Sequence, residues 1–128
     1  MTVNELLIDP TLKTPLVSFK PGGELIIQGR SIPEDGGLFF YTLFDWLEQY
    51  MLNPATNTVI TIELEYHNDI TSKYILKIIK DLKPVCENLS VRWIYETEDH
   101  DMLELGQMMC SLSGSRFDFI EKPESGRC

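Results

Sequence analysis

The length, composition and charge of the chain describe one ordinary globular domain and exclude two classes of partner. Its 128 residues suffice for a single domain with a real core. Apolar residues make up 43% and charged residues 24%, both usual for a soluble protein. The 20 acidic and 11 basic side chains give a formal net charge of -9. Such a surface repels nucleic acid phosphates and anionic membranes, so we expect neither as a partner.

The amino-terminal sequence and the cysteines predict a cytoplasmic protein with reduced thiols. Residues 1–15 lack a basic segment followed by an apolar one, so no secretory signal is predicted. The apolar stretches are too short to span a membrane. Cys86, Cys110 and Cys128 are odd in number and lack CxxC spacing, which argues against a disulfide framework or a zinc site. Cys128 ends a polar tail and is expected to be exposed.

The first half of the chain predicts a hairpin, a helix and a central strand. Two apolar segments, 16–19 and 24–29, flank a Pro-Gly turn and indicate a β-hairpin. Residues 38–52 carry apolar side chains at helical spacing, and Pro54 cannot continue that helix. The β-branched segment 58–66 predicts a central strand.

The second half alternates helix and strand. A helix is predicted over about 70–83, ending before Pro84, and a strand over 89–96. Another helix over 99–112 and a last strand over 116–121 follow. The whole order is ββαβαβαβ.

This order predicts an α/β fold in one domain. Helical crossovers make successive strands parallel and the connections right-handed, whereas the first pair is expected to be antiparallel. The result is a mixed, mainly parallel sheet of about five strands, with three main helices covering a face. One domain is predicted over 1–128, with a short polar tail from about 122.

The strand-to-helix loops of such a fold leave from the carboxyl ends of the strands. The segments "RSIPED" (30–35), "HNDITSK" (67–73) and "ETEDHD" (96–101) should therefore lie together, the second between the other two. We call these three segments the carboxyl edge. It is the candidate functional surface.

The sequence offers no pattern of a catalyst or a metal site. His67 and His100 are the only histidines, and neither has a partner at metal-ligand spacing. P-loop, GxGxxG and GxSxG motifs are absent from the sequence. Glu63 and Glu65 alternate with apolar residues, which indicates a solvated strand face rather than an acid–base pair. We therefore expect a non-enzymatic protein without catalytic residues, metal or cofactor.

Acidic residues gather where the last helix begins. Glu98, Asp99 and Asp101 could suggest a cation site, but the segment lacks the glycine and ligand rhythm of an EF-hand. Negative charge at a helix start favours the helix dipole. The structural explanation is therefore preferred.

The segment 67–73 supports two interpretations. If the helix begins near Ile70, Asp69 is its N-cap and accepts a hydrogen bond from the N–H of Thr71 or Ser72. The unpaired N–H groups and the positive dipole of a helix start also accommodate phosphate. A phosphorylated hydroxyl there would add nearly two negative charges for a partner to read. Residue chemistry favours the cap and leaves a regulatory site open.

The chain resembles the SiaC family of bacterial regulatory phosphoproteins. The resemblance runs over about residues 12–121 and rests on stretches such as "GELIIQGRSIPED", "LFDWLEQYM", "IELEYHNDITSKYILKIIKDL" and "VRWIYETEDHDMLELGQ". It implies a fold like that of anti-anti-sigma factor (STAS) domains, in agreement with the predicted element order.

The resemblance also implies a signalling switch. Family members are phosphorylated on a threonine by a serine/threonine kinase of the anti-sigma-factor type and dephosphorylated by a PP2C-type phosphatase. The unphosphorylated form binds and activates a diguanylate cyclase, which raises cyclic di-GMP and promotes aggregation and biofilm formation. This chain is therefore expected to bind a diguanylate cyclase under control of phosphorylation.

In the family, the segment that corresponds to residues 68–73 reads asparagine-threonine-serine-serine-x-lysine, and this chain departs from it. Asn68 and Lys73 match, and Thr71 matches one of the serines. The acceptor threonine falls on Asp69, and the next serine falls on Ile70. Phosphorylation at the family's own position is therefore in doubt.

Two hypotheses explain the departure. In the first, Asp69 is a fixed charge that partly mimics the phosphorylated state and locks the protein. In the second, the acceptor has moved to Thr71 or Ser72, and this hypothesis is preferred because hydroxyls remain within reach of the same surface. The expected partner-binding residues are Asn68, Asp69, Thr71, Ser72 and Lys73, with Arg30, Ser31 and Glu34 beside them.

Two other function classes remain as alternatives. A STAS-like domain could bind a small ligand, but an acidic edge without a glycine-rich phosphate cradle argues against nucleotides. A hydrolase is disfavoured because no nucleophile–base pair is visible.

Overall fold

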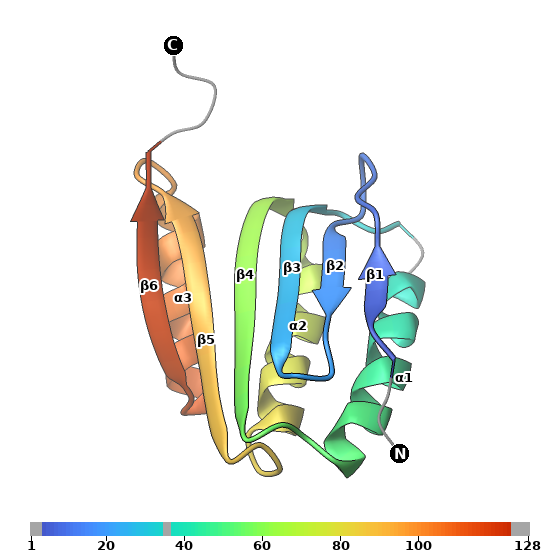
Figure 1. Cartoon of the computed structure of the whole chain (residues 1–128). Coiled ribbons are helices and arrows are strands. Elements are labelled where there is room, and N and C mark those ends of the chain that lie inside the picture. Colours follow the sequence, from blue (N-terminus) through green and yellow to red (C-terminus); the bar gives the residue numbers. More distant parts are fainter. Residues whose placement is uncertain (1–3, 35–36, 124–128) are drawn as a thin grey trace.

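Strands and helices alternate along the chain much as the sequence predicts (Figure 1). The computed structural model describes residues 4–34 and 37–123. Its elements are β1 (Leu6–Ile8), β2 (Leu16–Phe19), β3 (Glu24–Ser31), α1 (Leu38–Leu52), β4 (Asn57–His67), α2 (Asp69–Leu82), β5 (Asn88–Glu96), α3 (His100–Ser113) and β6 (Arg116–Lys122).

The described strands form one six-stranded sheet in the order β1-β2-β3-β4-β5-β6. β1, β2 and β3 pair antiparallel, and β3 to β6 pair parallel. The predicted mixed, mainly parallel sheet with an antiparallel first pair is confirmed. The predicted number of strands is one too low, because β1 was missed. β1 has only three residues, too few for an alternating pattern, and is held by its pairing with β2.

All three helices lie on one face of the sheet and leave the other face uncovered (Figure 1). We call the uncovered side the open face. Right-handed crossovers between neighbouring parallel strands place successive helices on the same side. The core fills the space between sheet and helices, and its largest fully buried side chains include Trp93, Tyr50, Phe19 and Phe40.

A close contact fixes α3 against the sheet. A Cβ atom at Gly106 would lie 2.5 Å from Nε1 of Trp93, so only glycine fits there without a shift. The indole N–H of Trp93 donates to the carbonyl oxygen of Met102 at 2.8 Å. Trp93 is also the last β5 residue paired with β4. The packing of α3 therefore holds β5 at the place where the β4–β5 ladder ends.

Two sequence predictions concern the carboxyl terminus. Lys122 is the last residue of β6, and the polar tail expected from about 122 stays a prediction. Cys128 and the tail from 124 lie outside the described residues. In the part of the chain that the structure describes, no helix is both long and apolar enough to cross a membrane.

Candidate functional site

The carboxyl edge assembles as the topology predicts. Ser31, which ends β3, pairs with His67, which ends β4. The Asn68 backbone N–H then donates to the Ser31 carbonyl oxygen at 3.2 Å, and its side-chain Nδ2 donates to the Pro33 carbonyl oxygen at 3.2 Å. β4 lies between β3 and β5 in the sheet. Segment 67–73, at the end of β4, therefore lies between segment 30–34 at the end of β3 and segment 96–101 at the end of β5. Asp35 lies outside the described residues.

The N-cap of α2 is Asn68, so the prediction that Asp69 is the cap is wrong. Asn68 has an extended backbone (φ -116, ψ 178), and its Oδ1 accepts from the Thr71 N–H at 3.1 Å. Asparagine is as good a cap as aspartate. Asp69 is instead the first helical residue, where its charge still favours the positive end of the helix dipole.

Thr71 and Ser31 form a buried hydroxyl pair. Both residues are 0% exposed, and their hydroxyl oxygens are 2.6 Å apart. The Thr71 hydroxyl donates to the Ser31 carbonyl oxygen at 2.7 Å and lies 3.2 Å from Asn68 Oδ1. Neither side chain reaches the surface in this conformation, and a contact of Ser31 or Thr71 with a partner stays a prediction.

The other predicted residues of segment 67–73 differ in accessibility. Asp69 and Lys73 are exposed, whereas Asn68 and Ser72 are half-buried. The Asp69 carboxylate makes no hydrogen bond or ion pair with the described residues. The Ser72 hydroxyl has only a long contact, 3.5 Å, with the Asn68 carbonyl oxygen. Asp69 and Lys73 are thus the charged groups that this corner presents to a partner.

The flanking residues Arg30 and Glu34 each have a contact within the chain. The Arg30 guanidinium lies 5.2 Å from the centre of the Tyr66 ring, a cation–π contact. Glu34, in the loop after β3, forms an exposed ion pair with Lys13. An exposed pair of this kind contributes little to stability and can exchange for a partner's charge.

The acidic start of α3 is structural, as predicted. Asp99 Oδ1 accepts from the Met102 N–H at 3.0 Å and caps the helix. Asp101 lies in the first turn. Within residues 4–34 and 37–123, no group of three or more histidine, cysteine or acidic side chains is placed to hold a metal ion.

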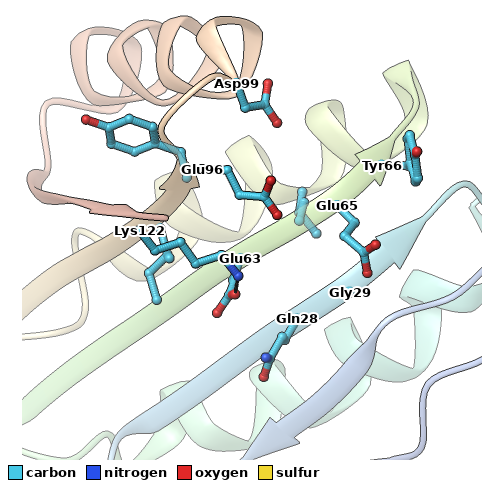
Figure 2. A pocket seen from close by; sticks show the side chains of 11 residues that line it. Gln28, Gly29, Glu63, Glu65, Tyr66, Glu96, Asp99 and Lys122 are labelled. Atoms are coloured by element: carbon cyan, nitrogen blue, oxygen red, sulfur yellow. Dashed lines mark hydrogen bonds and ion pairs between the residues drawn. The ribbon is translucent and has the colours of Figure 1, made fainter. Parts of the chain in front are cut away.

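A second feature of this end of the sheet was not predicted. A hollow of about 590 Å³ lies between β4 and β5, lined by residues 28–29, 63–66, 94–96, 99 and 122. We call it the trough. Figure 2 shows Glu63, Glu65 and Glu96 gathered around it on neighbouring strands, with Lys122 reaching toward Glu63. The sequence interpretation of Glu63 and Glu65 as a solvated strand face holds, but it did not show that the strands part beside them.

The described cysteines offer no activated nucleophile. Burial raises the pKa of the Cys86 thiol above its ordinary value, and a hydrogen bond with Thr58 opposes this only in part. A thiol that stays protonated is a poor nucleophile. Cys110 is half-buried, and its Sγ lies 3.5 Å from the Ser115 carbonyl oxygen.

Comparison with known proteins agrees with this fold. An uncharacterized protein of Pseudomonas aeruginosa strain UCBPP-PA14, PA14_02130, is 26% identical over 109 residues, which cover 82% of this chain and 86% of that protein. The crystal structure of apo-SiaC from Pseudomonas aeruginosa has a TM-score of 0.79 at 24% identity, covering 92% of this chain and 99% of that one.

A second solved structure contains a partner. It is the diguanylate cyclase SiaD of Pseudomonas aeruginosa in complex with its activator SiaC, and it matches with a TM-score of 0.83 at 24% identity. The match covers 91% of this chain and 99% of that chain. The family model described as SiaC family regulatory phosphoprotein matches residues 8–122. The chain therefore belongs to the SiaC family.

Proposed function

We propose that this chain is a non-enzymatic switch protein that binds a diguanylate cyclase and regulates it through the carboxyl edge. The observation that carries the proposal is the corner between β4 and α2. Its backbone is held by the Asn68 cap and the buried Ser31–Thr71 pair, while Asp69 stays exposed on the first turn. Membership of the SiaC family and the solved complex of SiaC with SiaD support the partner class.

The Asp69 carboxylate supplies a fixed negative charge at the switch position. The resemblance to the family implies that Asp69 stands where other members carry the acceptor threonine. One carboxylate charge stands where a phosphate would bring nearly two, so the mimicry of a phosphorylated state is partial. We therefore expect this chain to bind a cyclase more weakly than a variant without the charge.

The two neighbouring hydroxyls differ in accessibility to a kinase. A kinase cannot reach the Thr71 hydroxyl while it is fully buried against Ser31. Ser72 is only half-buried and weakly bonded, so it is the hydroxyl of this corner that a serine/threonine kinase and a PP2C-type phosphatase would use. Of the two hydroxyls that the sequence offers as a displaced acceptor, burial therefore favours Ser72 over Thr71, and this stays a prediction.

The cytoplasm is the proposed setting of this switch. The two described cysteines, Cys86 and Cys110, are free thiols. Free thiols persist in reducing compartments.

Calorimetry with a candidate diguanylate cyclase from the same genome tests the proposal. We expect Asp69→Thr and Asp69→Asn to bind the cyclase at least about tenfold more tightly than the native chain, because a repulsive or misplaced charge has been removed. Asp45→Asn is the matched control, since Asp45 is exposed on α1 away from the edge. Equal affinity of all four proteins would refute the role of Asp69, and no binding by any would refute the partner class.

Phosphopeptide mapping tests the switch chemistry. After treatment with a kinase of the anti-sigma-factor type, the native chain is expected to carry phosphate on Ser72 or on neither hydroxyl. Asp69→Thr is expected to become phosphorylated on the new threonine. Phosphate on Thr71 of the folded native chain would contradict the argument from burial.

A further inference from the structure

The sheet divides in two at its carboxyl end. The β3–β4 ladder runs on to Ser31↔His67, and the β5–β6 ladder runs on to Glu96↔Lys122. Between them the β4–β5 ladder stops at Ile62↔Trp93. From there the facing edges of β4 and β5 form no strand pair with each other, and the trough opens between them.

A β-bulge shapes the β4 side of the trough. Gly29 pairs with Leu64 but Arg30 pairs with Tyr66, so Glu65 is an extra residue on β4. A bulge bends its strand and increases the local twist. Glu65 and Tyr66 are consecutive and both exposed, although alternation would bury one of them. The bulge therefore bends β4 beside the trough and leaves Tyr66 exposed next to Glu65.

The trough has a strongly negative lining. Four carboxylates line it, those of Glu63, Glu65, Glu96 and Asp99, against the single ammonium of Lys122. Lys122 forms an ion pair with Glu63 across the trough, and Asp99 caps α3. The Glu65 carboxylate has no hydrogen bond or ion pair with the described residues, and it is exposed. The trough is therefore electrostatically complementary to a positively charged binding partner.

We propose that the trough receives an extended, basic segment of a partner protein, which pairs with the β4 edge beyond Ile62. Addition of a strand to an exposed edge draws affinity from main-chain hydrogen bonds and specificity from alternate side chains. Alternate side chains of the added segment would face the carboxylates on the open face, so arginine or lysine fits there. Those between would face the helices, so apolar residues fit.

This proposal goes beyond the proposed function and does not depend on it. The trough opens on the open face of the sheet, whereas Asp69 begins a helix that lies on the covered face (Figures 1 and 2). A partner could therefore occupy the trough whether or not a diguanylate cyclase is the partner of the corner.

Binding of a designed peptide tests the proposal. The probe is a fluorescein-labelled seven-residue peptide of alternating arginine and valine, titrated with the full chain and followed by anisotropy. Backbone amide shifts from a ¹⁵N-labelled protein locate the contact. We expect saturable binding and shifts confined to residues 63–66 and 94–96. Absence of binding, or shifts elsewhere, would overturn the proposal.

Two probe variants separate strand addition from simple charge attraction. The same peptide with N-methylated alternate residues keeps its charge but loses main-chain donors, so it is expected to bind at least about tenfold more weakly. A glutamate–valine peptide of the same length is expected not to bind. Equal affinity of the N-methylated peptide, or of the acidic one, would overturn the proposal.

Matched protein variants separate the trough from the net charge of the chain. Glu65→Lys is expected to lower the affinity for the arginine–valine peptide at least about tenfold. Glu104→Lys makes the same charge change on the exposed side of α3, outside the trough, and is expected to change affinity less than about threefold at moderate salt. Equal losses for the two variants would show nonspecific attraction and refute the site. Asp69→Asn should leave peptide affinity unchanged, which keeps this test distinct from that of the switch.

Discussion

Two neighbouring regions at the carboxyl end of the sheet are built in opposite ways. At the β4–α2 corner, Asn68 bonds to Thr71 and to Pro33, and Thr71 bonds to Ser31, so the polar groups that fix the backbone have internal partners. At the trough, only a few residues away, the strand ladder has ended and Glu65 has no partner among the described residues. The corner uses its polar residues for stability, and the trough leaves one of its carboxylates available for binding.

The difference shows how the end of β4 and the start of α2 can provide both stability and a binding surface. A buried polar group must be bonded, because leaving it without a partner costs much of its lost hydration. An exposed carboxylate remains hydrated and costs almost nothing. Substitutions should therefore change stability strongly at the corner and weakly at the trough.

The largest expected effect is that of Thr71→Val at the corner. The substitution keeps the shape and the backbone bond to Asn68, but it removes the buried hydroxyl that bonds to the Ser31 hydroxyl and carbonyl oxygen. We therefore expect a loss of about 2–3 kcal/mol in the free energy of unfolding. Urea unfolding followed by circular dichroism measures it. Ser72→Ala, next to it, should cost less than about 0.5 kcal/mol, because its hydroxyl contact is long. Similar costs for the two variants would remove the distinction between a buried and an accessible hydroxyl.

Asn68→Ala should have the next largest effect. It removes the cap and the bond to the Pro33 carbonyl oxygen, and we expect it to cost about 1–2 kcal/mol of unfolding free energy. Asn68→Asp retains the acceptor and loses only the donor, so its cost should be smaller. The same unfolding experiment measures both. If Asn68→Asp is as costly as Asn68→Ala, the tie to Pro33 rather than the cap holds the corner.

Lys122→Met tests the ion pair that crosses the trough. The pair with Glu63 is partly exposed, so its loss should cost less than about 1 kcal/mol and the difference should shrink at 0.5 M salt, a concentration on the order used to screen surface charges. Lys20→Met is the control, because the Lys20 ammonium has no ion-pair partner among the described residues. A loss above about 2 kcal/mol that is insensitive to salt would mean that the ion pair of Lys122 and Glu63 behaves as a buried structural pair rather than as a surface pair.

The smallest expected effect is that of Glu65→Gln. Its carboxylate has no hydrogen bond or ion pair with the described residues, so the free energy of unfolding should change by less than about 0.5 kcal/mol. A slight gain is expected, since the chain has an excess of negative charge. Thermal unfolding followed by calorimetry measures the change. A clear loss of stability would show that Glu65 has a structural role and would weaken the contrast between the two regions.

Particular residues show how far the sequence could predict the site. The element order placed segments 30–35, 67–73 and 96–101 at one edge, and the structure confirms this for their described residues. The cap was misplaced by one residue, because asparagine and aspartate cap equally well and the local sequence holds both. The prediction that Asp99 serves the start of α3 is confirmed, and the structure adds that it does so as the N-cap.

The sequence by itself determined what depends on near neighbours: the order of strands and helices and the apolar stripes of the helices. Tertiary structure alone decided that Thr71 is buried, because its partner Ser31 lies 40 residues away in the chain. It alone decided where β4 and β5 part, because a ladder ends through the twist and bulge of strands that meet only after folding. Contacts between distant segments leave no periodic pattern in either segment.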